Sequence, residues 1–163
     1  MYISYMFKNK FLTFILFLII TFSASFIGGL ATITFKEPWY SLLNKPTFNP
    51  PDWIFGPVWT FLYTLMGISA GIIWEKGLER EEVREALQIF GVHLLLNAFW
   101  TILFFGFQTP EIALAEILIL LITIILYTRR FYRIDHISGW MQVPYIAWVS
   151  FATILNLSIV WLN

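Results

Sequence analysis

The stretch WYSLLNKPTFNPPDWIFGPVWTFLY, residues 39–63, decides how the rest of the chain is interpreted. A membrane span needs only apolar side chains, whereas this stretch mixes tryptophan and proline with polar residues. Proline locks φ and lacks a backbone donor, so a stiff, non-helical segment is predicted at Pro46, Pro50 and Pro51. Gly56 and Pro57 then mark the head of a helix that runs into an apolar segment. The stretch therefore predicts a structured loop in front of a membrane helix.

The composition of the whole chain is that of an integral membrane protein. Of its 163 residues, 59% are hydrophobic, 20% aromatic and 12% charged, whereas soluble domains carry about 25% charged residues. The formal net charge is zero and the basic residues lie at the ends of apolar runs, which excludes a nucleic-acid-binding face. The absence of cysteine excludes disulfides and thiolate chemistry. The two histidines, His93 and His136, cannot form a metal site alone.

Five apolar runs are long enough to cross a bilayer as helices. A helix needs about 20 residues to span about 30 Å of hydrocarbon, and these runs lack the alternation of barrel strands. The fourth is short, so Arg129 and Arg130 must reach back to the interface. We therefore predict a single all-α integral membrane domain over residues 1–163. It is a bundle of five transmembrane helices at about 11–35, 53–74, 86–107, 112–131 and 139–162.

The N-terminal run allows two interpretations. Lys8 and Lys10 before an apolar segment, with small residues near Ala24, resemble a secretory signal peptide. The apolar run continues to Phe35, however, which is longer than a signal sequence needs. We expect it to be retained as the first helix.

The distribution of lysine and arginine predicts the orientation in the membrane. One side holds only Lys36 and Lys45. The other side holds Lys8, Lys10, Lys76, Arg80, Arg84, Arg129, Arg130 and Arg133. Because cytoplasmic loops are enriched in basic residues, the N-terminus should be cytoplasmic and the C-terminus outside. The sequence does not name the host membrane; we expect a prokaryotic cell membrane.

The two longest connections carry different signals. Residues 36–52 show no helical pattern, and a loop of this length in a compact domain is usually a lid, a binding loop or disorder. Its prolines and aromatic residues argue against disorder, so we predict a lid over the outer end. Residues 75–85 are typical of a solvated inner loop that continues into the third helix, and their charges need no function.

Some of the eight tryptophans lie deeper than interfacial anchoring explains. Four fall at the predicted membrane boundaries, where tryptophan is expected: Trp53, Trp74, Trp140 and Trp161. With a rise of 1.5 Å per residue, Trp59, Trp100 and Trp148 fall inside the membrane instead. Their depths allow them to meet in one cavity beneath the lid.

Aromatic rings and polar side chains share a face on three of the predicted helices. At helical spacing the faces are Phe55, Trp59 and Tyr63; His93, Asn97, Trp100, Thr101 and Phe104; and Tyr145, Trp148, Ala152 and Asn156. Since polar groups avoid lipid, the faces should point inward. Two interpretations remain open: ordinary interhelical packing, with hydrogen bonds of about 0.6 kcal/mol, or a ligand cavity.

Three stretches give the chain a specific family resemblance. Residues 39–63, LNAFWTILFFG at 96–106 and PYIAWVSFATILN at 144–156 resemble, in order and spacing, the signature stretches of the TspO/MBR family of tryptophan-rich sensory proteins and translocator proteins. The resemblance implies a five-helix bundle that forms a homodimer. It also implies binding of porphyrins, protoporphyrin IX or haem, and other flat hydrophobic ligands under the first loop. A role in tetrapyrrole regulation or stress response is implied, with no obligatory cofactor.

The resemblance also implies particular site residues. The family's pocket tryptophan on the second helix falls on Trp59, its third-helix amide on Asn97 and its fifth-helix tryptophan on Trp148. Ala147 matches a position where a small residue affects ligand binding and helix packing. With the inward faces, the predicted ligand-binding set is Trp39, Trp59, Tyr63, His93, Asn97, Trp100, Tyr145, Ala147 and Trp148. The predicted lid residues are Leu43, Lys45, Pro46, Pro50 and Pro51.

The expected mode of binding is ring stacking with polar anchors. Trp59 and Trp148 would offer stacking faces to a flat tetrapyrrole, and Asn97 would orient it by hydrogen bonding. Lys45 in the lid would pair with a propionate at the outer interface, where an exposed pair contributes only about 0–1 kcal/mol.

One departure from the family pattern concerns cholesterol. Leu157 and Trp161 stand where animal members have the tyrosine and arginine of a cholesterol-recognition consensus, and no basic residue follows Arg133. The sequence therefore argues against cholesterol binding through that motif, which is itself a weak pattern.

Two other functions compete with a receptor. An enzyme needs a poised acid, base or metal, and the only ionisable candidates within the predicted spans are His93 and Glu116. We expect His93 to be a packed neutral imidazole and Glu116 to be solvated or bonded to its own helix, which disfavours an enzyme; light-dependent porphyrin breakdown is the alternative chemistry. A porphyrin or sterol transporter has little support, because five helices lack an inverted repeat.

Small residues in the first two helices predict close helix contact. Gly67 and Gly71 form a GxxxG pattern, and Ala24 and Gly28 form a similar pair. Such patterns do not distinguish contact within one subunit from contact between two.

Overall fold

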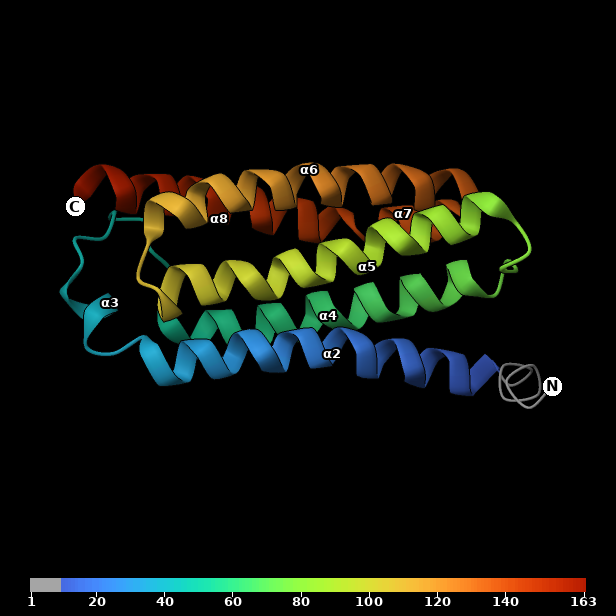
Figure 1. Ribbon diagram of the computed structural model, residues 1–163, viewed down its shortest axis with the longest axis horizontal. Helices are drawn as coiled ribbons and strands as arrows, with labels where there is room; N and C mark the ends of the chain where they lie inside the picture. The colour runs from blue at the N-terminus through green and yellow to red at the C-terminus, as the bar shows by residue number, and fades with distance from the viewer. Residues whose placement is uncertain (1–9) are drawn as a thin grey trace.

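The chain folds into a helical bundle, shown in Figure 1 as a computed structural model that describes residues 10–163. Lys8 of the orientation prediction, with the first nine residues of the predicted domain, lies outside the described residues. In chain order the elements are α2 (Lys10–Phe35), α3 (Trp39–Leu42), α4 (Asp52–Trp74), α5 (Glu81–Thr101), the π-helical segment η1 (Ile102–Gly106), α6 (Pro110–Ile134), α7 (His136–Trp140) and α8 (Val143–Leu162).

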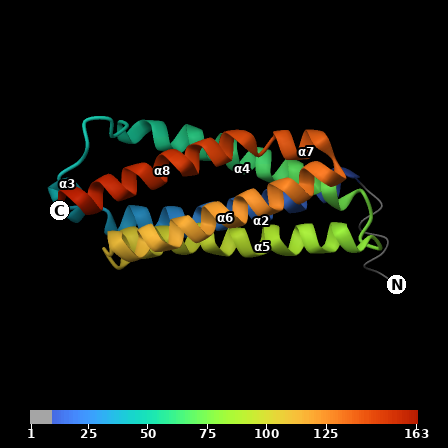
Figure 2. The same ribbon diagram turned by 90° about the horizontal axis from the view of Figure 1, so that it is seen from above.

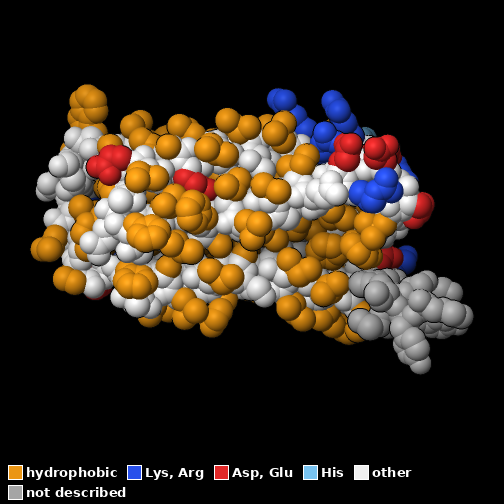
Figure 3. All heavy atoms as spheres, viewed as in Figure 1, with side chains coloured by type: hydrophobic (Ala, Val, Ile, Leu, Met, Phe, Trp, Pro, Cys, Tyr) orange, Lys and Arg blue, Asp and Glu red, His pale blue; other side chains and the backbone are white. Residues whose placement is uncertain are grey.

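Five helical segments of the described chain are long and apolar enough to cross a membrane: α2, α4, α5 with η1, α6, and α7 with α8. They run side by side along the long axis of the molecule (Figures 1 and 2). The most extensive contacts are those of α5 with α6 and of α2 with α4. Apolar side chains cover the middle of the outer surface (Figure 3), as lipid requires. The predicted fold class, an all-α bundle of five transmembrane helices, is confirmed.

Helices α4, α5 and α6 begin earlier than predicted, each for a local reason. Helix α4 begins at Asp52, whose charge complements the positive helix end, so Pro57 lies inside the helix rather than at its head. Helix α5 begins at Glu81 rather than residue 86, because Glu81 and Glu82 favour a helix N-terminus in the same way. Helix α6 begins at Pro110, a residue well suited to the first turn.

The predicted fifth helix, residues 139–162, is interrupted. Helix α7 ends at Trp140 and α8 begins at Val143, with a turn at Met141 and Gln142. Pro144 has no backbone N–H to donate to the carbonyl of Trp140, and it lies in the first turn of α8 instead. The prediction of one continuous helix is therefore wrong at this point.

Residues 36–51 cover one end of the bundle and are called the lid below. The prediction of a loop without helix is wrong for Trp39–Leu42, which form α3. From residue 44 to residue 51 the backbone is non-helical, and this is the part that contains the prolines. The lid is tied to the end of α8: the Asn44 backbone N donates to Asn163 Oδ1 at 2.9 Å, and Asn163 Nδ2 donates to the Asn44 carbonyl at 3.0 Å.

Glycines bring α4 directly onto α2 within the same chain. A Cβ atom on Gly67 would stand 3.1 Å from the Leu18 Cα, and one on Gly71 would stand 2.7 Å from the Phe14 ring. The close contact that the GxxxG pattern allows is thus made inside one subunit.

The two ends of the bundle differ in charge. Apart from Lys36 and Lys45, the described lysines and arginines gather at the end opposite the lid, called the basic end below (Figure 3). Lys76 pairs there with Asp135 at 2.7 Å. This asymmetry is the one on which the predicted orientation rests, and the direction of the chain across the membrane stays a prediction.

Candidate ligand site

A cavity of about 420 Å³ lies among the helices beneath the lid. Its walls come from α2, α4, α5 with η1, α6 and α8, and α3 contributes Tyr40. The volume is within the range of about 300–1,000 Å³ that is usual for small-molecule sites, which are mostly apolar with a few polar groups. Of the predicted ligand-binding residues, the cavity brings together Trp59, Tyr63, Asn97, Trp100 and Trp148.

Asn97 and Tyr63 form the floor of the cavity, toward the basic end, and Tyr145 lies behind them, outside the lining. The Tyr63 hydroxyl donates to Asn97 Oδ1, and Asn97 Nδ2 donates to the Tyr145 hydroxyl at 2.9 Å. None of the three is more than 5% exposed. Because Oδ1 keeps a second lone pair and Nδ2 a second hydrogen, the amide is held in place and can still bond to a guest.

Aromatic rings supply much of the wall. The Trp59 ring centroid lies 5.5 Å from that of Tyr63 and 6.2 Å from that of Tyr145. Trp148, on α8, meets Phe55 of α4 edge-on at 5.8 Å. These neighbours hold the two indoles in place, so apolar ring surface is available at fixed positions in the cavity.

Trp100 joins three helices at the cavity wall. Its Nε1 donates to Asn156 Oδ1 at 3.2 Å, and Asn156 Nδ2 donates to the Pro110 carbonyl at 2.8 Å. The Trp100 ring stacks on Phe104 at 5.0 Å between centroids. Phe104 belongs to η1, and short π-helical segments occur frequently at functional sites.

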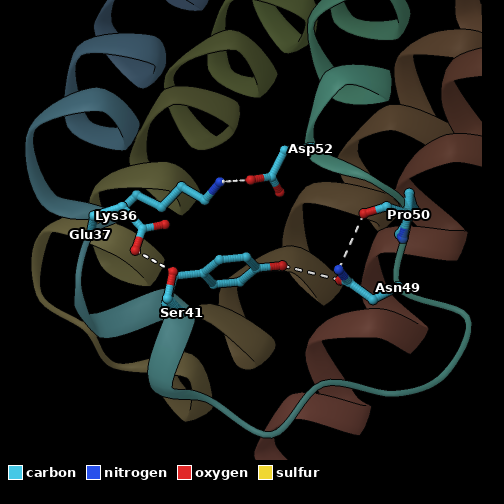
Figure 4. Close-up of polar contacts among 7 residues, drawn as sticks. Lys36, Glu37, Ser41, Asn49, Pro50 and Asp52 are labelled. Atoms are coloured by element: carbon cyan, nitrogen blue, oxygen red, sulfur yellow. Dashed lines mark hydrogen bonds and ion pairs between the residues drawn. The ribbon is translucent and has the colours of Figure 1, made fainter.

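Charged groups stand at the mouth of the cavity under the lid. Lys36 Nζ pairs with Asp52 Oδ2 at 2.5 Å (Figure 4), and both residues line the cavity. The Tyr40 hydroxyl donates to Asn49 Oδ1 at 3.1 Å, and burial together with the nearby Asp52 charge raises the pKa of Tyr40. Lys45 Nζ lies 4.7 Å from the centre of the Tyr40 ring, a cation–π distance. The mouth is therefore the polar end of the site.

The predicted lid residues lie beside the cavity and do not line it. Trp39, predicted to bind ligand, packs edge-on against Phe104 at 5.6 Å, and Leu43 packs on the same cluster. Pro46 and Pro50 are half-buried, whereas Pro51 is exposed. Trp39 therefore supports the wall from behind.

Three further predicted binding residues also stand away from the cavity lining: His93, Tyr145 and Ala147. His93 is one turn below Asn97 on α5 and is fully buried; its Nδ1 donates to the Phe90 carbonyl at 2.6 Å. Ala147 is exposed, because successive helical residues are about 100° apart and the inward side of α8 is occupied by the buried Tyr145 and the cavity-lining Trp148. The prediction that Ala147 contacts a ligand is therefore not supported by its position, because its side chain points away from the cavity.

Glu116 differs from the sequence-based expectation. It was expected to be solvated or bonded to its own helix, yet it is only 6% exposed. Neither carboxylate oxygen has a hydrogen-bond partner among the described residues. The reason is its place on the inward face of α6, next to the cavity-lining Ile117.

Helix α2 contributes to the cavity in a way that the sequence analysis missed. Ser25, Gly28, Gly29 and Thr32 all line it. A Cβ atom on Gly29 would have no atom within 4 Å, so this position faces open volume. Small residues in an apolar span were the available signal, because they leave room for a guest as well as for a neighbouring helix.

Fold and site together define a class: a five-helix membrane protein with an aromatic cavity closed by a lid. The model of the TspO/MBR family matches residues 15–162, and the chain belongs to this family. The resemblance carried by the three sequence stretches is confirmed, as is a multi-pass membrane location.

Relatives from distant organisms share most of the chain. The tryptophan-rich protein TspO of Chlorobaculum tepidum is 37% identical over 156 residues, which cover 96% of this chain and 99% of the relative. The protein of the same name from Archaeoglobus fulgidus is 41% identical over 138 residues, 85% of this chain and 88% of the relative. The human translocator protein is 34% identical over 119 residues, 72% of this chain and 70% of the relative.

Proposed function

We propose that the protein is a membrane receptor that binds porphyrins and other flat hydrophobic molecules in the cavity. The observation that carries this proposal is a cavity of about 420 Å³ whose lining joins Trp59 and Trp148 to the amide of Asn97. A flat aromatic guest gains about 0.5–1.5 kcal/mol from each ring pair beyond the burial of its area. The names of the relatives state no ligand; the choice of porphyrins comes from the family resemblance, and the aromatic lining of the cavity supports it.

The polar groups suit a guest that is apolar in the middle and anionic at one edge. Asn97 lies at the deep end and Lys36 at the mouth. A carboxylate of a porphyrin would pair with Lys36 in place of Asp52, an exposed interaction of about 0–1 kcal/mol. The sequence-based hypothesis gave this role to Lys45, but Lys45 lies over the Tyr40 ring and outside the lining, so we assign the role to Lys36.

The lid gives a route from binding to a signal in tetrapyrrole regulation or stress response. Tyr40 of the lid lines the cavity, and Asn44 of the same lid is bonded to Asn163 at the end of α8. A guest that moves Tyr40 would therefore alter the surface at the lid end. This sensing role is part of the proposal.

Titration of the purified protein in detergent with protoporphyrin IX, followed by tryptophan fluorescence quenching, tests the site. The double variant Trp59→Phe with Trp148→Phe keeps apolar rings but loses indole surface, so binding should weaken about threefold to tenfold, equivalent to about 0.7–1.4 kcal/mol. Trp161→Phe is the matched control, because Trp161 is 87% exposed and lies outside the cavity. If the double variant and the natural chain bound protoporphyrin IX with equal affinity, the assignment of binding to this cavity would be wrong.

A further inference from the structure

Below the cavity floor, buried polar side chains continue toward the basic end. In order of contact from the cavity they are Asn97, Tyr145, His93, Tyr127 and Gln142, and Ser138 follows four residues before Gln142 in α7; we call this set the polar column. None of the six is more than 4% exposed. Polar groups at this depth of a membrane protein are costly, and an ionisable one such as His93 is a candidate for a functional role.

The upper part of the polar column runs from the cavity to a histidine. Asn97 Nδ2 donates to the Tyr145 hydroxyl at 2.9 Å, and the Tyr145 and His93 ring centroids are 5.6 Å apart. His93 lies 4.5 Å from Tyr127, again between centroids. The imidazole is therefore the link between the floor of the cavity and the lower part.

The lower part reaches the surface at the basic end. The Tyr127 hydroxyl donates to Gln142 Oε1 at 2.8 Å, in the turn between α7 and α8. In α7, just before that turn, the Ser138 backbone N donates to Asp135 Oδ1 at 3.0 Å. Asp135 is partly exposed and is paired with Lys76, so the surface of the basic end lies one backbone hydrogen bond away from Ser138.

Three members of the column carry buried atoms without a hydrogen-bond partner among residues 10–163: His93 Nε2, Gln142 Nε2 and Ser138 Oγ. His93 Nδ1 donates to the Phe90 carbonyl, which can only accept, so Nε2 of the neutral ring is a bare acceptor. The amide nitrogen of Gln142 offers donors and the Ser138 hydroxyl offers both. Buried polar atoms of this kind are the usual ligands of internal water molecules.

We propose that the polar column binds water at these atoms and conducts protons between the basic end and the cavity. A proton carried by water from the Asp135 side binds to His93 Nε2 and makes the ring an imidazolium, while the Nδ1–H bond to Phe90 is unchanged. Nε2 then releases a proton to water beside the Tyr145 hydroxyl. An O–H bond of the incoming hydronium breaks as the Nε2–H bond forms, and the Nε2–H bond breaks as an O–H bond forms on the receiving water, so one proton enters and one leaves.

The cavity completes the path across the membrane. It extends from Asn97 at the floor to Lys36 and Asp52 at the mouth, and the Asp52 side chain is 65% exposed. Water therefore reaches the cavity from the lid side. This inference does not depend on porphyrin binding.

Proton flux into liposomes tests the proposal. The full chain is reconstituted in vesicles that contain a pH-sensitive dye, and a potassium gradient with valinomycin provides the driving potential. The natural chain should change the internal pH several-fold faster than protein-free vesicles, and His93→Phe should return the rate to the protein-free value. His136→Phe is the matched control, because His136 is exposed and stacks on Tyr132 outside the polar column.

A second variant keeps the test decisive if His93→Phe does not fold. Gln142→Leu removes the amide that accepts from Tyr127 and whose Nε2 has no partner among the described residues. It should lower the flux while the circular dichroism spectrum in detergent stays helical. Flux by the natural chain equal to that of protein-free vesicles would overturn the proposal. So would a folded His93→Phe or Gln142→Leu variant with undiminished flux, since the column would then be a static hydrogen-bond network.

Discussion

The half of the bundle beneath the lid and the half toward the basic end are packed differently. Under the lid the helices separate around a cavity of about 420 Å³, lined by half-buried rings such as those of Trp59 and Trp148. Toward the basic end Gly67 brings α4 onto α2, and Met66 and Ile73 are completely buried. The difference indicates that close packing in one half holds the bundle together, while the other half keeps an open cavity.

Added volume in the closely packed half should have the largest effect. In Gly67→Val the new side chain meets Leu18, whose Cα would be 3.1 Å from the Cβ. Overpacking of this kind costs about 1–3 kcal/mol, and we expect a clear fall in the thermal unfolding temperature in detergent. Gly91→Ala is the control, because a Cβ there has no atom within 4 Å. Equal stability of the Gly67 and Gly91 variants would contradict the comparison.

Loss of one buried hydroxyl in the same half should be the next largest effect. Tyr127→Phe removes the donor to Gln142 Oε1 and leaves that amide unpaired, at a cost of about 1–3 kcal/mol. Tyr132→Phe should change the unfolding temperature little, because Tyr132 is 41% exposed. If Tyr127→Phe left the unfolding temperature unchanged, the buried Gln142 amide would have found another partner.

Added volume in the open half should act on binding and spare stability. Gly29→Leu places a side chain in the cavity, where a Cβ meets no atom within 4 Å. The helix should gain up to about 1 kcal/mol from the loss of glycine, while quenching by protoporphyrin IX should be largely lost. A leucine that lowers the unfolding temperature as much as Gly67→Val does would erase the distinction between the two halves.

The tie between lid and α8 should have a smaller and local effect. Asn163→Ala removes both side-chain bonds to the Asn44 backbone, worth about 0.5–1.5 kcal/mol each at most, because the site is exposed. Hydrogen exchange in residues 39–51 should become faster, with no change in α4. Ser158→Ala, which loses only a bond within α8, serves as control. Unaltered exchange in the lid would show that its position is held by packing alone.

The smallest effect is expected from pH at the basic end. The hydrogen bond from Lys76, with that from the Ser138 backbone, holds the pKa of Asp135 below its usual value. Because the pKa of Asp135 is lower in the folded state than in the unfolded state, its charged form stabilises the fold at pH values above the unfolded-state pKa of about 3.9. This contribution is lost as the pH falls through the folded-state pKa. Lys76→Met should therefore make the unfolding temperature less sensitive to pH below about 4. An unchanged acid response would show that the Lys76–Asp135 pair contributes nothing to stability.

Much of the fold followed from composition and from single residues. Apolar runs of sufficient length gave the five spans, and glutamates such as Glu81 account in retrospect for a helix start that was placed too late. Pro144 was equally visible, but an apolar run conceals a break, since hydropathy does not report backbone hydrogen bonds.

The candidate site was only partly predictable, because side-chain spacing gives direction but not depth. Asn97 and His93 share one face of α5, yet only Asn97 reaches the cavity, and His93 packs one turn below its floor. Gly29 carries no side-chain chemistry and could be placed only by the open volume around it. Ala147 entered through family resemblance alone, and its own position on the outside of α8 does not bring it to the cavity.

The double hydrogen bond between Asn44 and Asn163 has a practical consequence for experiments on this protein. A purification tag fused directly after Asn163 would be attached to the anchor of the segment that closes the cavity, and it could loosen that segment before any ligand is added. Affinities measured on such a fusion would then describe a protein whose cavity is partly opened. A cleavable tag at the opposite terminus avoids this artefact.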